Sequence, residues 1–329
     1  MLRYLLVAYG VIRMQILHVW DQAGVACIFA KYQIRNGHQS KVIRIEGDKY
    51  GIYQFYKDYV TNVRKDEFVD RCIDEARGAD IIHIHGPINV LFALRREFGK
   101  SKTIILHYLG TDIRGLDPSE KPATYARPSI FSIILDVVFK KMQGLPLPKD
   151  YIHILAQKLA DVVLVATPDL IQYVDKGVYL PIPVDTEHFV PDPVPDQKKC
   201  GLTFNTEVTN ISRAIEYCNN NNIHLDIEVY DRTRNPIMYA EMPGFLKKYQ
   251  IYVDIRYIKQ TILRNLSSTA LQSLASGLRV LNYQLKYLDT FPVEHDPITL
   301  TRQLLSLYAV EGRRFSSYLW YFAFRLTRR

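Results

Sequence analysis

Short apolar runs bounded by polar and turn-forming residues recur along the first half of the chain. They stand at Gln15–Val19 and at residues 80–85, 103–107 and 160–167. Runs of four to eight apolar residues are typical of strands buried on both faces of a parallel sheet. Between two of these runs, residues 89–98 show helical spacing. The pattern predicts strands that alternate with helices, as in a doubly wound α/β domain.

Residues 252–283 repeat this order in the second half of the chain, as a strand, a loop, a helix and another strand. Gly277 stands just past the last helical residue, where glycine favours a left-handed end. The helix opens with Ser267, Ser268 and Thr269. Such residues cap a helix, and its free backbone N–H groups lie at the positive end of the dipole. We therefore predict an anion site here, with a diphosphate as its natural ligand.

The segment TALQSLASGLRVL within this region resembles the donor-binding segment of family 4 glycosyltransferases. Where that family carries two glutamates, this chain has Arg264 and Gln272. Gln272 keeps an oxygen acceptor for a ribose hydroxyl but lacks the charge of glutamate. Arg264 is suited to bidentate binding of a diphosphate.

Two segments of the first half carry the same resemblance. Residues 177–191, GVYLPIPVDTEHFVP, are similar to the family's LPNPVDTExFxP, with Ile182 in place of asparagine. Residues 108–114, YLGTDIR, resemble its HGSDxR turn, with Leu109 in place of histidine. Because side chains alternate along a strand, His107 faces the same side as Leu109, which suggests a displaced catalytic role. The alternative for His107, as for His83 and His85, is packing at a strand end.

The resemblance covers about residues 14–283. It implies a GT-B fold, in which two Rossmann-like, doubly wound α/β domains face each other across a cleft. We expect an acceptor-side domain over residues 1–190, a linker over 191–199 and a nucleotide-sugar-side domain over 200–300. The linker is rich in proline and charge. Residues 301–329 are expected to form a helix that crosses back to the first domain or faces a membrane.

The candidate site residues follow from these matches. We expect catalytic roles for His107, Asp112 and Arg264, donor binding by Ser267, Ser268, Thr269 and Gln272, and an acceptor-side loop containing Gly24, Gly110 and Thr111.

Charge and composition narrow the class of partner. At 329 residues, with 48% hydrophobic and 23% charged residues, the chain has the size and composition of a globular protein with two cores. A net charge of +8 points to acidic partners. Because no zinc finger, RNP motif or basic heptad region is visible, we expect no nucleic acid among them. The expected partners are a nucleotide sugar, a glycan or lipid-linked acceptor, and an anionic membrane surface.

Cysteine spacing bears on metals and location. Cys27, Cys72, Cys200 and Cys218 are scattered without CxxC or CxxH spacing. The spacing indicates neither a disulfide framework nor a zinc site, so we expect no metal and a reducing, cytoplasmic environment.

Two apolar stretches leave a choice between core and membrane surface. Residues 128–147 place apolar side chains at helical spacing near Lys140 and Lys141, and residues 315–326 form an aromatic stripe among arginines. Each stretch suits either a helix packed on its own domain or an interfacial helix at the inner face of a membrane. No apolar run reaches the roughly 18 residues that a spanning helix needs. The apolar segment before Met14 lacks the features of a signal peptide, and we expect it to be an extension upstream of the first domain.

The resemblance implies retaining, metal-independent transfer of a sugar from a nucleotide diphosphate sugar to a glycan or lipid-linked acceptor, with no further cofactor. Leu109, Arg264 and Gln272 replace three residues that hold the sugar and the leaving group in the family. The alternative is therefore a catalytically silent subunit that binds a sugar nucleotide or a partner. The sequence leaves the donor base, the sugar and the acceptor open.

Overall fold

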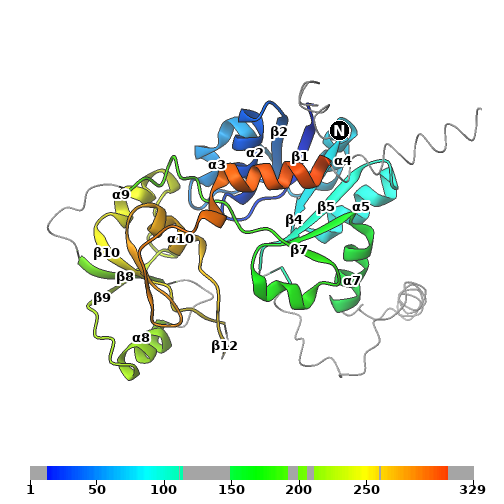
Figure 1. Ribbon diagram of the computed structural model, residues 1–329. Coiled ribbons are helices and arrows are strands. Elements are labelled where there is room, and N and C mark those ends of the chain that lie inside the picture. Colours follow the sequence, from blue (N-terminus) through cyan, green and yellow to red (C-terminus); the bar gives the residue numbers. More distant parts are fainter. Residues whose placement is uncertain are drawn as a thin grey trace, which may run out of the picture.

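The computed structural model describes residues 13–110, 112–113, 149–191, 199–205, 211–258 and 261–309. Two α/β domains stand side by side, each with its own mostly parallel sheet (Figure 1). The predicted fold class is therefore confirmed. Thr111, residues 128–147 and the aromatic stripe at residues 315–326 lie outside the described residues.

The first domain contains a seven-stranded parallel sheet in the order β3-β2-β1-β4-β5-β6-β7. The order reverses between β1 and β4, and ligands of doubly wound sheets bind beyond the carboxyl ends of strands at such a point. All four apolar runs noted in the sequence form strands of this sheet. The strands are β1 (Gln15–Val19), β2 (Gln39–Ile45), β3 (Val60–Val63), β4 (Ile81–His85), β5 (Thr103–Tyr108), β6 (Val162–Val165) and β7 (Gly177–Tyr179).

Helices cover both faces of this sheet. Helices α4 (Phe68–Arg77), α5 (Ile88–Phe98) and α7 (Lys149–Leu159) share one hydrophobic core with the strands. On the opposite face lie α2 (Val25–Arg35) and a helix over residues 297–309. The shorter helices of this domain are α3 (Ile52–Phe55), η1 (Lys57–Tyr59) and η3 (Pro168–Tyr173).

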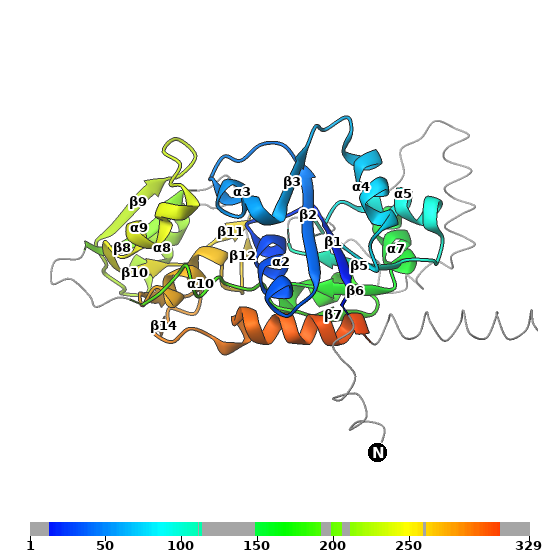
Figure 2. The ribbon, with the colours of Figure 1, turned by 90° about the horizontal axis from the view of Figure 1, so that it is seen from above.

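The helix over residues 297–309 returns from the second domain and packs on the first (Figure 2). Its Leu300, Leu304 and Tyr308 are buried against β1, β4 and α2. These three residues are spaced four apart, so they form one apolar face of the helix. In the part of the chain that the structure describes, no helix is long and apolar enough to cross a membrane.

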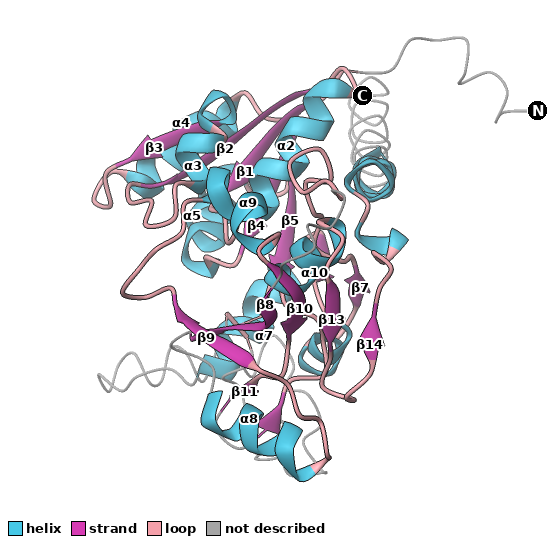
Figure 3. Cartoon of the chain, turned by 90° about the vertical axis from the view of Figure 1, so that its left-hand side faces the viewer, coloured by secondary structure: helices cyan, strands magenta, loops and turns pink. Residues whose placement is uncertain are grey.

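The second domain contains a five-stranded sheet in the order β14-β13-β10-β8-β9, of which only β14 runs antiparallel. Figure 3 shows β8, β10 and β13 side by side, with α10 next to them. The strand predicted at residues 252–255 starts earlier, as part of β10. The strands are β8 (Lys199–Asn205), β9 (Ile227–Asp231), β10 (Tyr249–Val253), β13 (Arg279–Leu281) and β14 (Tyr287–Leu288), with a separate pair β11 (Tyr257–Ile258) and β12 (Thr261–Ile262). The helices are α8 (Ile211–Asn220), η4 (Tyr239–Glu241), α9 (Met242–Leu246), α10 (Ser268–Ala275) and η5 (Val293–His295).

Contacts between the domains are both apolar and polar. One core cluster contains Tyr56 and Val184 of the first domain and Tyr239 and Leu271 of the second. The hydroxyl groups of Tyr56 and Tyr239 lie 3.1 Å apart, and the Tyr239 backbone N–H donates to the Tyr50 carbonyl at 2.7 Å. The packing therefore holds the two sheets in a defined arrangement around the space between them.

Candidate functional site

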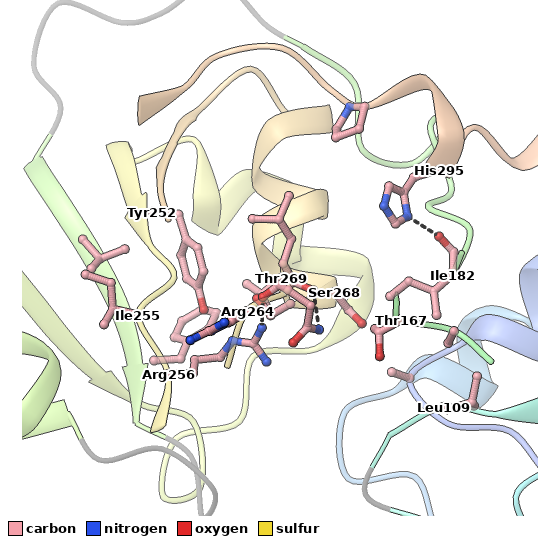
Figure 4. A pocket seen from close by; sticks show the side chains of 18 of the residues that line it. Leu109, Thr167, Ile182, Tyr252, Ile255, Arg256, Arg264, Ser268, Thr269 and His295 are labelled. Atoms are coloured by element: carbon pink, nitrogen blue, oxygen red, sulfur yellow. Dashed lines mark hydrogen bonds between the residues drawn. The ribbon is translucent and has the colours of Figure 1, made fainter. Parts of the chain in front are cut away.

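A cavity of about 540 Å³ lies between the two domains. The first domain contributes Leu109, Thr167 and Ile182 to its lining, and the second contributes the start of α10 and several arginines. Figure 4 shows Arg256, Arg264, Ser268 and Thr269 on one side, with Leu109 and Thr167 on the other. The cavity thus adjoins the carboxyl ends of strands from both sheets, as expected for a ligand site in this architecture.

The start of α10 has the cap that its sequence predicts. The Ser267 hydroxyl accepts the backbone N–H of Ala270 at 3.0 Å, and the Ser267 N–H donates to Asp254 at 2.9 Å. Within the described residues, the backbone N–H groups of Ser268 and Thr269 have no hydrogen-bond partner. Because Ser267, Ser268 and Thr269 all line the cavity, these amides are placed to bind an anion there.

Replacing Ser267 with alanine should remove this cap and lower the free energy of unfolding by about 1 kcal/mol. Ser268→Ala is the matched control, since the Ser268 side chain caps nothing, and it should change stability by less than about 0.5 kcal/mol. Urea unfolding of the two variants measures the difference. Equal losses in both would show that the Ser267 hydroxyl does not stabilise the helix.

Three arginines of the second domain line the cavity: Arg232, Arg256 and Arg264. Arg256 is held in place, because its Nε atom lies 2.9 Å from Asp254 and its guanidinium donates to the Asn265 carbonyl. Arg264 is exposed, and no hydrogen bond or ion pair joins it to the described residues. It is therefore free to bind a ligand.

Arg232 is partly buried among aromatic rings. Its guanidinium lies 4.7 Å from the ring of Tyr50 and 4.9 Å from that of Phe204. Burial lowers the pKa of Arg232 from its usual value, although the group stays protonated near neutral pH. The aromatic contacts hold a positive charge at the edge of the cavity.

Arg232 and Arg256 were not among the residues expected at the site from the sequence. Arg232 directly follows β9, and Arg256 comes three residues after β10. In parallel sheets, ligand-binding residues lie at the carboxyl ends of the strands. The position of each arginine just after a strand could therefore have identified it as a candidate. The first strand of the second domain, β8, ends at Asn205 and contributes no cation to the lining. Arg232 and Arg256 of the lining follow its two neighbours in the sheet, β9 and β10.

The predicted catalytic residues of the first domain lie behind the cavity lining. His107 is fully buried, and its Nδ1 atom lies 3.3 Å from Nε2 of His83. Burial lowers the pKa of His107 to about 3. Asp112 accepts the backbone N–H groups of Leu109 and Gly110 at 2.9 and 2.7 Å, which fixes the turn after β5. Burial raises the pKa of Asp112. Leu109 lines the cavity, whereas His107 and Asp112 do not.

Two further predicted site residues, Gly24 and Gln272, lie near the cavity without lining it. Gly24 begins α2 with a φ of 86°, which favours glycine, and its N–H donates to Asp21 at 2.9 Å. Its neighbour Ala23 lines the cavity, whereas Gly24 does not. Gln272 is half-buried on α10 and is not part of the lining. Direct roles for Gln272, His107 and Asp112 therefore stay predictions.

His295 is a further polar residue of the cavity that the sequence analysis did not identify. Its Nδ1 atom donates to the Ile182 carbonyl of the first domain at 2.7 Å, and its own carbonyl accepts the N–H of Val184 at 3.1 Å. Burial lowers the pKa of His295, so the ring is neutral at neutral pH. With Nδ1 protonated, Nε2 remains as an acceptor.

Comparison with protein-family models finds no match, and comparison with curated protein sequences finds none either. Solved structures are similar in fold. An α-glucosyltransferase in complex with UDP and a 13-mer DNA containing an HMU base has a TM-score of 0.50 at 11% identity, over 96% of this chain and 100% of that chain. An α-glucosyltransferase in complex with UDP-glucose and DNA containing an abasic site has a TM-score of 0.51 at 13% identity, over 94% and 95%.

These comparisons and the two facing sheets establish the fold class. The chain has the GT-B fold, with two Rossmann-like domains across a cleft. At 11 to 13% identity the likeness establishes the fold and leaves the activity to be argued from the site.

The comparisons correct one expectation of the sequence analysis. We expected no nucleic acid partner because the chain has no familiar nucleic-acid-binding motif. That exclusion is wrong, since proteins of this same architecture are solved in complex with DNA. The physical reason is that a cleft between two domains, with charge on its walls, can bind nucleic acid without a separate motif.

Proposed function

We propose that this protein is a glycosyltransferase that transfers a sugar from a nucleotide diphosphate sugar. The proposal rests on one observation. Arg232, Arg256, Arg264 and the start of α10 lie together on one wall of the cavity between the domains.

Charge supports a diphosphate as the group bound on this wall. Three guanidinium groups line the cavity, and among its described lining residues Glu294 is the one carboxylate. Guanidinium groups bind phosphate oxygens through two parallel hydrogen bonds, and the free amides of Ser268 and Thr269 add donors at the positive end of a helix. An anion with several oxygens satisfies these donors better than a neutral ligand does.

The same groups fit the chemistry of transfer. When the bond between sugar and diphosphate breaks, negative charge develops on the leaving diphosphate, and fixed donors that face this charge lower the barrier. Arg256 is preorganised by Asp254 and Asn265, so little rearrangement is needed at that moment. We propose a retaining reaction, following the family resemblance, with a glycan, a lipid-linked sugar or a hydroxyl-bearing nucleic acid as acceptor. A cytoplasmic location and attachment to a membrane surface stay predictions.

One observation favours a second candidate, a catalytically silent subunit that binds a sugar nucleotide. The side chain that faces the cavity from the β5 turn is Leu109, which cannot donate a hydrogen bond to a sugar, and Arg264 stands where the family has a carboxylate. Binding of the diphosphate would survive these replacements, whereas positioning of the sugar would depend on other groups.

Titration calorimetry with a panel of nucleoside diphosphates, followed by a transfer screen, tests both candidates. We expect at least one nucleoside diphosphate to bind, and the matching sugar nucleotide to be consumed with one of three acceptor classes: glycans, lipid-linked sugars or DNA with hydroxymethylated bases. Absence of binding across the whole panel would refute both candidates.

The double variant Arg264→Glu, Gln272→Glu separates the two candidates. If the native protein is an enzyme with a repurposed site, turnover should fall in this variant. Binding without native turnover, with turnover appearing only in the double variant, would favour the silent subunit.

A further inference from the structure

Four histidines form one buried layer inside the first sheet. His18 lies on β1, His83 and His85 on β4, and His107 on β5, and each is at most 1% exposed. His18 pairs in register with His83, and His85 pairs with His107. Because alternate residues of a strand share a face, all four rings lie on the side covered by α2 and the helix over residues 297–309.

The rings turn nitrogen atoms toward one another. Nδ1 of His18 lies 2.9 Å from Nε2 of His85, and Nε2 of His83 lies 3.3 Å from Nδ1 of His107. Among the residues that the structure describes, His18, His83 and His85 each offer a ligand atom, and these atoms lie within 4.8 Å of one another. Two histidines at alternate positions of one strand, with a third in register on the next strand, are well placed to share an ion.

The outward nitrogens of two of these histidines are held by other side chains. Nε2 of His18 donates to the Gln33 amide oxygen at 2.8 Å, and Nδ1 of His83 lies 2.6 Å from the Tyr308 hydroxyl. Such partners orient a metal-ligating imidazole and determine which nitrogen is left for the metal. The contacts with Gln33 and Tyr308 leave Nδ1 of His18 and Nε2 of His83 available to a metal, and both atoms point toward the other histidines.

An ordinary hydrophobic core does not account for this layer. Elsewhere the same face of the sheet is apolar, with Ile16, Ile81, Ile105 and Leu164. Nδ1 of His85 and Nε2 of His107 are also buried without a hydrogen-bond partner among the described residues, so hydrogen bonds within the layer do not satisfy all of its nitrogens. Burial lowers the pKa of each of the four histidines, so at neutral pH they are uncharged, which is the form that binds metals.

We propose that His18 Nδ1, His83 Nε2 and His85 Nε2 bind a divalent transition-metal ion. Neutral imidazole ligands suit zinc, and three histidines are one of the ligand sets that zinc takes in proteins. Zn–N bonds of about 2.0 to 2.1 Å place tetrahedral ligand nitrogens about 3.4 Å apart, so the pair from His18 and His85 opens by about half an ångström. The ion links β1 and β4, and through the contact of His83 with Tyr308 it supports the helix over residues 297–309.

This site is independent of the proposed sugar transfer, because none of the four histidines lines the cavity between the domains. Metal binding can therefore be tested without a donor or an acceptor. The cysteine spacing led us to expect no metal, whereas the His-x-His pattern of residues 83–85 was the available signal for one.

Elemental analysis of the full-length, tag-free protein is the first test, followed by removal of metal with a chelator and titration with Co²⁺ and Zn²⁺. We expect one equivalent per chain, the visible absorption of tetrahedral cobalt, and a higher unfolding temperature with metal than without it. Metal-free protein that gives no cobalt absorption and no change in unfolding temperature would overturn the proposal.

Variants locate the site. Gln33→Met keeps every ligand but removes the oxygen that orients His18, and should weaken metal binding by about 10- to 100-fold. His18→Leu combined with His85→Leu should abolish it, and if that variant fails to fold, the Gln33→Met affinity decides. His224→Gln, at an exposed histidine of the second domain, is the control and should bind as the native protein does. Loss of binding in His224→Gln, or unchanged affinity in Gln33→Met, would show that the ion binds elsewhere.

Discussion

Replacing Arg264 with alanine is expected to weaken nucleoside diphosphate binding by about 10- to 100-fold, equivalent to about 1.4 to 2.8 kcal/mol. Arg264 is exposed in the cavity, and none of the described residues forms a hydrogen bond or ion pair with it. Its truncation should therefore remove charge-assisted bonds to the ligand while leaving the fold intact. Titration calorimetry with the nucleoside diphosphate that the native protein binds best gives the change in affinity.

Arg279→Ala is the matched control for this prediction. Arg279 is an exposed arginine of the same domain, on β13, and it does not line the cavity. The control removes the same net charge, so any loss of affinity that it shows measures long-range electrostatics alone. Equal losses in the two variants, or none in Arg264→Ala, would mean that Arg264 does not contact the diphosphate. Arg264→Lys adds a finer test, because lysine keeps the charge and loses bidentate geometry.

Replacing Asp185 with alanine is expected to lower the free energy of unfolding by about 3 to 5 kcal/mol. Asp185 is fully buried, lies 2.8 Å from the Lys31 ammonium and accepts the Tyr56 hydroxyl at 2.8 Å. The Lys31 side chain is itself only 12% exposed, so loss of Asp185 leaves a poorly solvated cation. Because Tyr56 also meets Tyr239 of the second domain, the loss should loosen the contact between the domains. Urea unfolding, followed by fluorescence, measures the effect.

Glu187→Ala is the matched control here, since Glu187 pairs with the same Lys31 at 3.1 Å. Its side chain is 48% exposed, and exposed ion pairs contribute about 0 to 1 kcal/mol. We therefore expect a loss below about 1 kcal/mol in this variant. If Asp185→Ala lowers the free energy of unfolding as little as the control does, burial of the ion pair does not contribute to stability. The Lys31 ammonium would then be solvated by water in the variant.

The sequence by itself determined the elements and the fold class. Apolar runs such as Gln15–Val19 and residues 103–107 predict buried parallel strands, because a short apolar run bounded by polar residues is a local feature of the sequence. The cap at Ser267 and the end of α10 before Gly277 could also be predicted from the sequence, because both depend on residues within one turn of the helix. The segments that resemble family 4 glycosyltransferases extended these local signals to the two-domain arrangement.

Only the tertiary structure decided which side chains meet. Arg232, Arg256 and Arg264 follow different elements, and their common place in the cavity depends on strand order, a non-local property of the fold. His107 and Leu109 illustrate the same limit. Alternation assigns both to one side of the sheet, but His107 lies inside β5 and is fully buried, whereas Leu109 lies past the strand end and lines the cavity. Burial of a side chain depends on what packs over it, and for His83 that includes Tyr308, which lies 225 residues further along the chain.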